Sequence, residues 1–264
     1  EWNLVIGPGA DLFHRLQEMP VKLGDVASRI FQGLATSADR IYVLELRSED
    51  RDLYTAYSAS LAREVRLERS ICQPVVKGSE IHRYCPLSPE RILIFPYHVV
   101  GEEAMPWTER ELISTTPRAY EYLRMQRAAL EERSGPPGPW FVYKYPKSLA
   151  LYSRPKLMTG VLAARASFAY EERGGVCFVG GGNAGGYGIV LDPNTDLGYF
   201  YVLGLLNCRL SDFYLRKVST TFRGGYYSYG RRFIEQLPIR TIDWDDSADV
   251  ARHGRMVALV QQTL

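Results

Sequence analysis

Apolar residues recur three or four positions apart in several parts of the chain, which is the spacing of a helix that buries one face. The pattern predicts helices over residues 9–19, 116–133, 197–218 and 247–264. Thr116 and Pro117 support the second of these, because Thr is a frequent helix cap and Pro suits the first helical position. The third is apolar over a broad face and is expected to lie in the core.

Short apolar or aromatic runs bounded by turn residues predict strands. They cover residues 23–30, 41–46, 91–97, 140–145, 156–162, 167–170, 176–179 and 187–191. The run Ser134–Pro139 (SGPPGP) ends a predicted helix and is a candidate linker. We therefore expect an α+β (mixed) fold of short-stranded sheets, several packed helices and a closing C-terminal helix. It divides into an N-terminal lobe, residues 1–133, and a β-rich lobe, residues 140–264, or forms one continuous domain.

The chain has 264 residues, enough to bury a substantial core without disulfide bonds. Its four cysteines form no CxxC pair, which favours a reduced, cytoplasmic protein over a disulfide scaffold. No signal peptide is evident, and the longest uncharged run, Gly174–Leu191, holds eight glycines and does not suit a membrane span. The first residue is Glu1 and not Met, so we expect a piece of a longer protein.

The formal net charge is only +2, but the charge is unevenly distributed. Residues 144–232 carry 12 Lys and Arg against 5 Asp and Glu, a net charge of +7. The residues before and after this segment carry net charges of −3 and −2. A local basic excess can attract a polyanion, and an ordinary solvated face is an equally good explanation from charge alone.

The sequence shows no set of residues typical of a catalytic site. Gly180, Gly182 and Gly185 form G-x-G-x-x-G, but the chain continues as a predicted strand where a dinucleotide site needs a helix. We expect a glycine-rich loop there. The acidic pair Glu171-Glu172 is expected to lie solvated in a turn. The spacing of four nearby Cys and His residues matches no common zinc site: Cys72, His82, Cys85 and His98.

Two clusters combine cations with tyrosines and suggest a nucleic-acid surface. Arg and Lys neutralise phosphates, Arg also reads guanine edges, and Tyr offers a hydroxyl group and a flat ring. Binding of a protein or a carbohydrate is the alternative, and many tyrosines are expected in the core. The clusters are Lys144, Lys147, Arg154 and Lys156 beside Tyr143, Tyr145 and Tyr152, and Arg223, Arg231 and Arg232 beside Tyr226, Tyr227 and Tyr229.

The order of several motifs resembles a known family. The motifs are LGDVASRIFQGLATSADRIYVLE, VVKGSEIHRY, ILIFPY, TTPRAYEYLRMQRAALEER, PWFVYKYP, RPKLM, YFYVLGLLNCRLSDFYLRKVS and FIEQLPI, over roughly residues 23–264. In this order they resemble the TaqI-like C-terminal specificity domain of adenine-specific DNA methyltransferases and Eco57I-like type II restriction-modification enzymes. The family usually has Asn-Ser where this chain has Asn207-Cys208, a change expected to affect only packing.

The resemblance implies that this chain recognises double-stranded DNA and does not methylate or cut it alone. In such enzymes a separate N-terminal methyltransferase domain of the same protein binds S-adenosylmethionine and holds the flipped adenine with an Asn/Asp-Pro-Pro-Tyr motif. That motif is absent here. We therefore expect no cofactor, metal or catalytic residue in this chain. A type I-like specificity subunit is an alternative within the same class.

The resemblance also implies a clamp whose loops enter the major groove. The candidate reading loops are Gln32–Asp39, Gly180–Gly188 and Arg223–Arg232. Arg223 and Arg231 are candidates to read bases. The helix over 247–264 either docks on the rest of the enzyme or packs on this domain. The full set of candidate DNA contacts is Thr36, Ser37, Tyr226, Tyr227, Arg223, Arg231 and Arg232, with Lys144, Lys147 and Lys217 assigned to phosphates.

Overall fold

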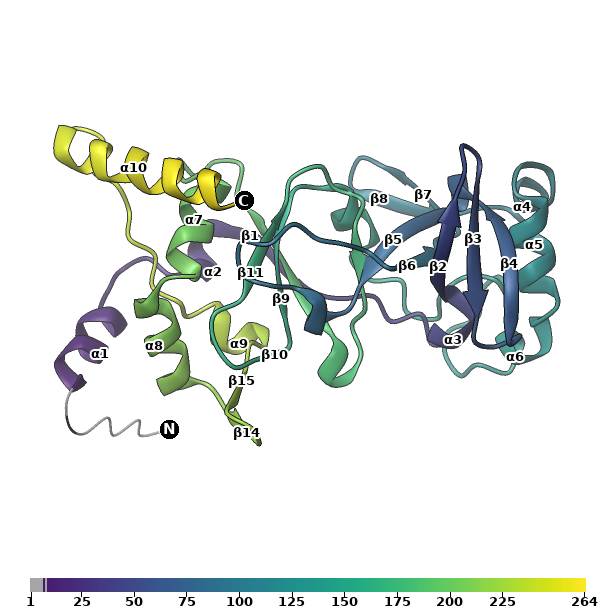
Figure 1. Ribbon diagram of the computed structural model, residues 1–264, viewed down its shortest axis with the longest axis horizontal. Coiled ribbons are helices and arrows are strands. Elements are labelled where there is room, and N and C mark those ends of the chain that lie inside the picture. The colour runs from purple at the N-terminus through teal and green to yellow at the C-terminus, as the bar shows by residue number, and fades with distance from the viewer. Residues whose placement is uncertain (1–6, 8) are drawn as a thin grey trace.

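The computed structural model describes residue 7 and residues 9–264 of an elongated molecule (Figure 1). Helices and short strands are interleaved along the chain, and the strands form several small sheets. The predicted α+β class is confirmed, as are the short-stranded sheets and the closing C-terminal helix.

The larger sheet has six strands in the order β12-β5-β6-β2-β3-β4. Its strands are antiparallel except for β12, which runs parallel to β5. Helices α4–α6 cover its far end, on the right of Figure 1. The bounds are β2 (Val43–Glu49), β3 (Leu53–Ser58), β4 (Arg63–Glu68), β5 (Cys72–Val76), β6 (Arg91–Ile94), β12 (Cys177–Phe178), α3 (Asp39–Tyr42), α4 (Glu109–Thr115), α5 (Pro117–Arg124) and α6 (Arg127–Glu131).

The second sheet has four antiparallel strands in the order β1-β13-β9-β11. Helices α7, α8 and α10 lie at its outer end, on the left of Figure 1. The bounds are β1 (Ala27–Gln32), β9 (Lys156–Gly160), β11 (Phe168–Glu171), β13 (Gly186–Leu191), α1 (Ala10–Gln17), α2 (Leu23–Val26), α7 (Tyr199–Leu206), α8 (Arg209–Val218), α9 (Arg231–Ile234) and α10 (Ser247–Thr263).

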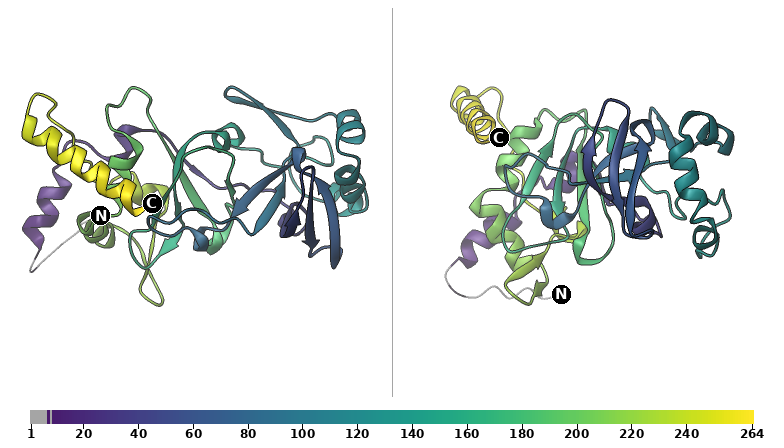
Figure 2. Two further views of the ribbon diagram at one scale, coloured as in Figure 1. Left: turned by 45° about the horizontal axis from the view of Figure 1, so that its top comes forward. Right: turned by 45° about the vertical axis from the view of Figure 1, so that its right-hand side comes forward.

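Two small sheets complete the fold. β7 (Tyr97–Val100) pairs with β8 (Glu103–Pro106), and β14 (Thr221–Phe222) pairs with β15 (Tyr226–Ser228), which also pairs with β10 (Leu162–Ala163). The segment Thr220–Arg232, expected as a loop, is therefore largely a β-hairpin. It projects from the body of the molecule in both views of Figure 2.

The buried apolar residues form two clusters, the four-stranded sheet contributes to both, and the clusters do not follow residues 1–133 and 140–264. Phe31, Tyr143 and Phe178 share the core of the larger sheet, whereas Phe13, Phe168 and many residues of α7–α9 share the other. Strands from both sides of Ser134–Pro139 pair in each sheet. A division into lobes at this loop stays a prediction, and the pairing across it favours one continuous domain.

The predicted strand over 140–145 is wrong, although its first four residues are buried. Side chains take the backbone hydrogen bonds that a neighbouring strand would otherwise make. The Tyr42 hydroxyl donates to the Phe141 carbonyl (3.0 Å), and the Tyr143 N–H donates to the Tyr97 hydroxyl (2.7 Å). An apolar run of this length predicts a strand. Here its backbone groups bond to the side chains of Tyr42 and Tyr97 and not to a neighbouring strand.

The predicted helix over 197–218 is broken into α7 and α8 at Asn207. The side chain of Asn207 is buried and pairs with the backbone of Phe168, donating to its carbonyl (2.9 Å) and accepting from its N–H (2.9 Å). Asn207 therefore fixes the helix turn against β11. The helix over 116–133 is likewise two helices, α5 and α6, and the Thr116 hydroxyl donates to the Leu112 carbonyl and does not cap α5.

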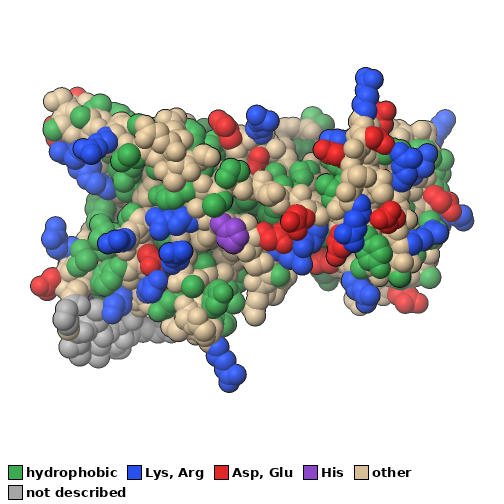
Figure 3. All heavy atoms as spheres, in the orientation of Figure 1, with side chains coloured by type: hydrophobic (Ala, Val, Ile, Leu, Met, Phe, Trp, Pro, Cys, Tyr) green, Lys and Arg blue, Asp and Glu red, His purple; other side chains and the backbone are tan. Residues whose placement is uncertain are grey.

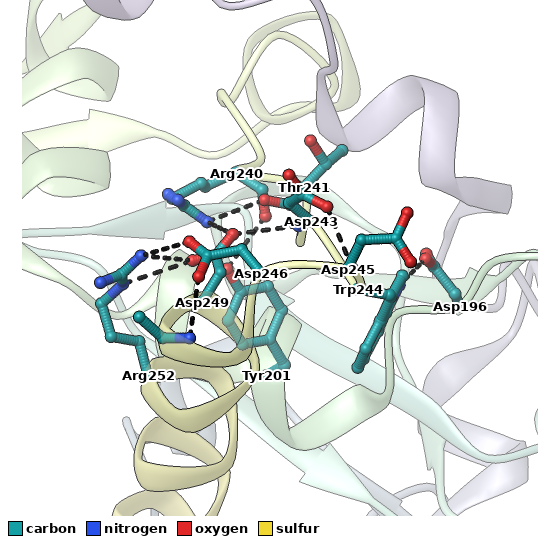
Figure 4. Close-up of polar contacts among 11 residues, drawn as sticks. Asp196, Tyr201, Arg240, Thr241, Asp243, Trp244, Asp245, Asp246, Asp249 and Arg252 are labelled. Atoms are coloured by element: carbon teal, nitrogen blue, oxygen red, sulfur yellow. Dashed lines mark hydrogen bonds and ion pairs between the residues drawn. The ribbon is translucent and has the colours of Figure 1, made fainter.

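The C-terminal helix α10 packs on α7, with Met256 and Val260 against Gly204. Figure 4 shows the polar cluster at its first turn. The Asp249 carboxylate accepts from Arg240 (2.8 Å) and from the Asp243 N–H (3.0 Å). The hydrogen bond from Arg240 is the main reason that the pKa of Asp249 falls to about 2. The helix α10 therefore packs on this domain, as one of the two expectations had it.

A buried ion pair joins two strands of the four-stranded sheet. Lys156 on β9 is fully buried, and its ammonium donates to Glu171 on β11 (2.7 Å) and to the Tyr152 carbonyl (2.9 Å). Burial lowers the pKa of Lys156, and the bond to Glu171 opposes that shift. The expectation that Glu171 is solvated in a turn is wrong, because its partner lies on the neighbouring strand.

We expect Glu171→Gln to lower the free energy of unfolding by about 3–5 kcal/mol, because it leaves a buried ammonium without a counter-charge. Urea denaturation of the purified chain measures the change. Glu172→Gln is the matched control, since Glu172 is exposed, and should cost less than about 0.5 kcal/mol. The double variant Lys156→Met/Glu171→Leu removes both charges and should recover most of the loss. A Glu171→Gln variant as stable as the parent would contradict the ion pair.

Candidate nucleic-acid interface

The loop Gln32–Asp39 connects β1 to α3 and is held by its own side chains. Thr36 is 1% exposed; its hydroxyl donates to the Asp39 carboxylate (2.5 Å) and accepts from the Ala38 N–H (3.0 Å). Ser37 is exposed and has a left-handed backbone, with φ of 59°. Of the two candidate contacts in this loop, Ser37 faces solvent, whereas Thr36 shapes the loop.

Arg133 organises the same loop, a role that sequence reasoning missed. Its guanidinium donates to the carbonyls of Thr36 (3.2 Å), Trp140 (2.7 Å) and Val142 (3.0 Å). It also lies over the ring of Tyr42. Burial raises the pKa of Tyr42, and the positive charge of Arg133 lowers it by a smaller amount. The only signal in the sequence is an Arg before SGPPGP, and that signal does not reveal which carbonyls it will reach.

The glycine-rich loop Gly180–Gly188 lies directly against the loop Gln32–Asp39. The Gly180 N–H donates to the Leu34 carbonyl (2.8 Å), and the Gly33 N–H donates to the Gly186 carbonyl (3.0 Å). A Cβ atom at Gly180 would overlap the carbonyl of Gly33. Strand β13 follows this loop, which confirms the expected strand and leaves no helix to receive a phosphate. The glycines here allow close backbone packing.

The same ladder of backbone hydrogen bonds continues to the hairpin β14–β15. The Val161 N–H donates to the Gly185 carbonyl (2.8 Å), and the Tyr229 N–H donates to the Val161 carbonyl (2.8 Å). The three candidate reading loops are therefore tied to one another through the main chain. They follow one edge of the molecule, the lower edge of Figure 1. We refer to the three loops and their exposed side chains as the loop edge.

Arg223 occupies the tip of the hairpin, between Phe222 and Gly224. It is exposed, and it makes no hydrogen bond or ion pair with any residue that the structure describes. Its guanidinium is therefore available to a ligand. Tyr226 beside it is 46% exposed.

Three further candidate cations flank the hairpin, and all are exposed. Lys217 ends α8 just before β14, with its ammonium 5.9 Å from the Phe213 ring. Arg231 and Arg232 open α9 just after β15. Arg231 pairs with Glu235 on the same helix (3.1 Å), and Arg232 lies over a neighbouring ring. Exposed ion pairs of this kind are weak and are easily exchanged for a phosphate.

Tyr227, the remaining candidate in the hairpin, faces the protein. The Arg216 guanidinium lies 5.2 Å from its ring centre and is itself held by Asp212 (2.9 Å) and the Ala164 carbonyl (3.0 Å). Arg216 therefore fastens the base of the hairpin to α8. Sequence reasoning gave no role to Arg216, because its ring partner lies eleven residues away across a turn.

Lys144 and Lys147, the remaining candidate cations, come from the segment that follows Ser134–Pro139. Lys144 is half-buried and donates to the Pro136 carbonyl (3.4 Å). Lys147 is exposed between Pro146 and Ser148, which line a depression with Pro193. Pro193 follows the far end of β13, whereas the glycine loop precedes its near end. Lys147 thus lies at the opposite end of that strand from the glycine loop.

The folded surface is less rich in cations and tyrosines than the sequence suggests. Lys156 is buried, and Arg154 pairs with Glu102 (2.6 Å). Eight tyrosines are in the core: Tyr42, Tyr97, Tyr122, Tyr143, Tyr152, Tyr201, Tyr214 and Tyr229. Even so, Lys and Arg side chains gather over α8 and β15 on the face shown in Figure 3, while acidic side chains are more frequent over the larger sheet.

Within the described residues, no group of three or more His, Cys, Asp and Glu side chains is placed to hold a metal ion. Within the same residues, no helix is long and apolar enough to cross a membrane. Cys72 is buried in the core and Cys85 is exposed.

Known proteins resemble this chain over most of its length. It is 26% identical over 242 residues to the type II restriction enzyme and methyltransferase RM.Eco57I of Escherichia coli, a match that covers 85% of this chain and 24% of that protein. The chain thus spans about a quarter of the length of that relative. A family model described as the TaqI-like C-terminal specificity domain matches residues 73–239, which include the glycine loop and the hairpin. The chain therefore belongs to the family of TaqI-like C-terminal specificity domains.

Proposed function

We propose that this chain is the target recognition domain of a type II restriction-modification adenine-N6 DNA methyltransferase, and that it binds a specific sequence of double-stranded DNA. The observation that carries the proposal is the exposed Arg223, which has no partner among the described residues, at the tip of a hairpin tied by backbone bonds to two other loops. A two-stranded β-ribbon fits the major groove of B-DNA, and an Arg there can make two bonds to guanine. Membership of a specificity-domain family supports the same function.

The residues of the loop edge take different parts in this function. Arg223 reads a base from the hairpin tip, and Ser37 contacts the DNA from the neighbouring loop. Lys217, Arg231 and Arg232 hold phosphates on either side, because they flank the hairpin and remain exposed. Lys147 reaches DNA only where the duplex extends past the far end of β13, and Lys144 keeps its assignment to a phosphate.

In this proposal, a methyltransferase domain of the same protein carries out the methylation of DNA. S-adenosylmethionine would bind there, because this chain lacks the Asn/Asp-Pro-Pro-Tyr motif and its glycine loop packs against backbone. The relative named above is both a restriction enzyme and a methyltransferase and is about four times as long as the matched part. We place this function in the cytoplasm, and we expect this chain alone to show no methylation or cleavage of DNA.

Binding of duplex DNA should depend steeply on salt. We expect log K to fall linearly with log salt concentration, with a slope of about −2 or steeper, because each neutralised phosphate contributes about −0.9. Fluorescence anisotropy of a labelled duplex, titrated with this chain at several salt concentrations, measures the slope. An affinity that does not change with salt concentration, or no binding to any duplex, would favour a protein- or carbohydrate-binding module.

Arg223→Ala should weaken discrimination at a single base position by about 1–3 kcal/mol, because a bidentate contact to one base is lost. Selection from a random duplex pool, repeated with the variant, measures the change. Lys217→Ala should instead weaken binding to all sequences alike and make the salt slope shallower by about 1.

Arg110→Ala is the matched control for both variants. Arg110 is exposed on α4 at the far end of the molecule and should leave affinity and preference unchanged. If Arg223→Ala selected the same sequences with the same affinity as the parent, the assignment of the hairpin as a reading element would be wrong.

A further inference from the structure

Two aromatic side chains stand exposed on the outer face of the hairpin. Phe222 is 43% exposed and Tyr226 is 46% exposed. They are directly opposite each other in the β14–β15 pair, so their side chains lie on the same face. The next pair, Thr221 and Tyr227, uses the opposite face, where Tyr227 is covered by Arg216. The hairpin therefore turns one face to α8 and presents the aromatic pair to solvent.

The hairpin is fixed at its base, and residues 222–225 at its tip are exposed among the residues that the structure describes. At the base, the Ser219 hydroxyl donates to the Ser228 carbonyl (2.6 Å), and Ser228 is the Cα partner of Leu162 on β10. At the tip, Gly224 and Gly225 have φ of 79° and 77°, which closes a tight turn. The Tyr226 ring lies beside Gly224. A narrow, stiff projection of this kind can enter a space that a larger element cannot.

The positive charge around the aromatic pair indicates which kind of molecule would bind it. From Lys217 to Ile234 the chain has four Lys and Arg residues and no Asp or Glu. Arg223 lies immediately next to Phe222 and has no acidic partner among the described residues. An apolar protein surface would have to bury this cation, whereas the stacked bases of DNA offer flat apolar faces surrounded by phosphates. Duplex DNA therefore matches both the rings and the charges.

We propose that Phe222 enters the base stack as a wedge, with Tyr226 packed behind it, while Arg223 reads the adjacent base. This inference rests on the proposed function, and it adds that the domain distorts the DNA that it reads. Apolar side chains that insert between base pairs unstack them, and the lost stacking is offset by new contacts along the bent duplex. Recognition then depends on how easily a step opens as well as on base edges.

The test compares two labelled duplexes that differ only in one abasic site placed opposite an intact base. An abasic site removes part of the unstacking cost, so the parent chain should bind that duplex about tenfold more tightly. Phe222→Ala should lose this preference to within about twofold, with an unchanged salt slope, because Phe222 contacts no phosphate. Phe222→Trp should retain the preference. A fluorescent adenine analogue at the opened step should brighten with the parent chain and stay dark with Phe222→Ala.

Ile113→Ala is the matched control, because Ile113 is 50% exposed on α4, far from the hairpin, and should leave both affinities unchanged. If the parent chain binds duplex DNA with a steep salt slope but shows no abasic preference, or if Phe222→Ala keeps that preference, the wedge is wrong and the proposed function stands. If neither duplex binds in a salt-dependent way, the proposed function fails and the wedge fails with it.

Discussion

The candidate interface depends on places where two backbones approach too closely to admit a side chain. Gly180 packs on Gly33, and Gly78 packs on both Gly185 and Gly160. A Cβ atom at Gly78 or Gly180 would overlap a carbonyl of the facing segment, so any larger residue would force the segments apart. Gly33 and Gly180 lie where the chain passes between the two larger sheets, from β1 to β2 and from β12 to β13, and Gly185 lies in the second of these crossings. The two crossings are also two of the candidate reading loops.

This arrangement links the stability of the fold to the placement of the interface. The backbone N–H and carbonyl groups of each crossing need hydrogen-bond partners although they lie outside a regular sheet. The other crossing supplies them. The hairpin joins the same ladder through Val161. The relative positions of the three loops are therefore set by main-chain geometry. Side chains such as Ser37 and Arg223 remain free to contact a partner.

The sequence predicts the class of fold and the approximate elements, because periodicity and turn residues are local signals. It does not predict which strands pair. That is why Glu171 was placed in solvent although Lys156 lies opposite it on β9. The assignment of Thr36 to DNA stays a prediction, and its buried hydroxyl bonds to Asp39 within the same loop. A count of charges along the chain treats Lys156 and Arg223 alike, whereas folding buries one and exposes the other.

The hairpin differs from the scaffold in how little of the fold depends on it. Asn207 and Glu171 are buried and make bonds that no other residue replaces. The tip around Arg223, in contrast, is exposed, and the hairpin meets the rest of the described domain nearer its base, through β10 and Arg216. Substitutions at the tip therefore cost little stability, because they leave no buried group unsatisfied and open no cavity. A domain built this way can change what it reads at the tip while Asn207, Glu171 and the glycine contacts keep the loops in place.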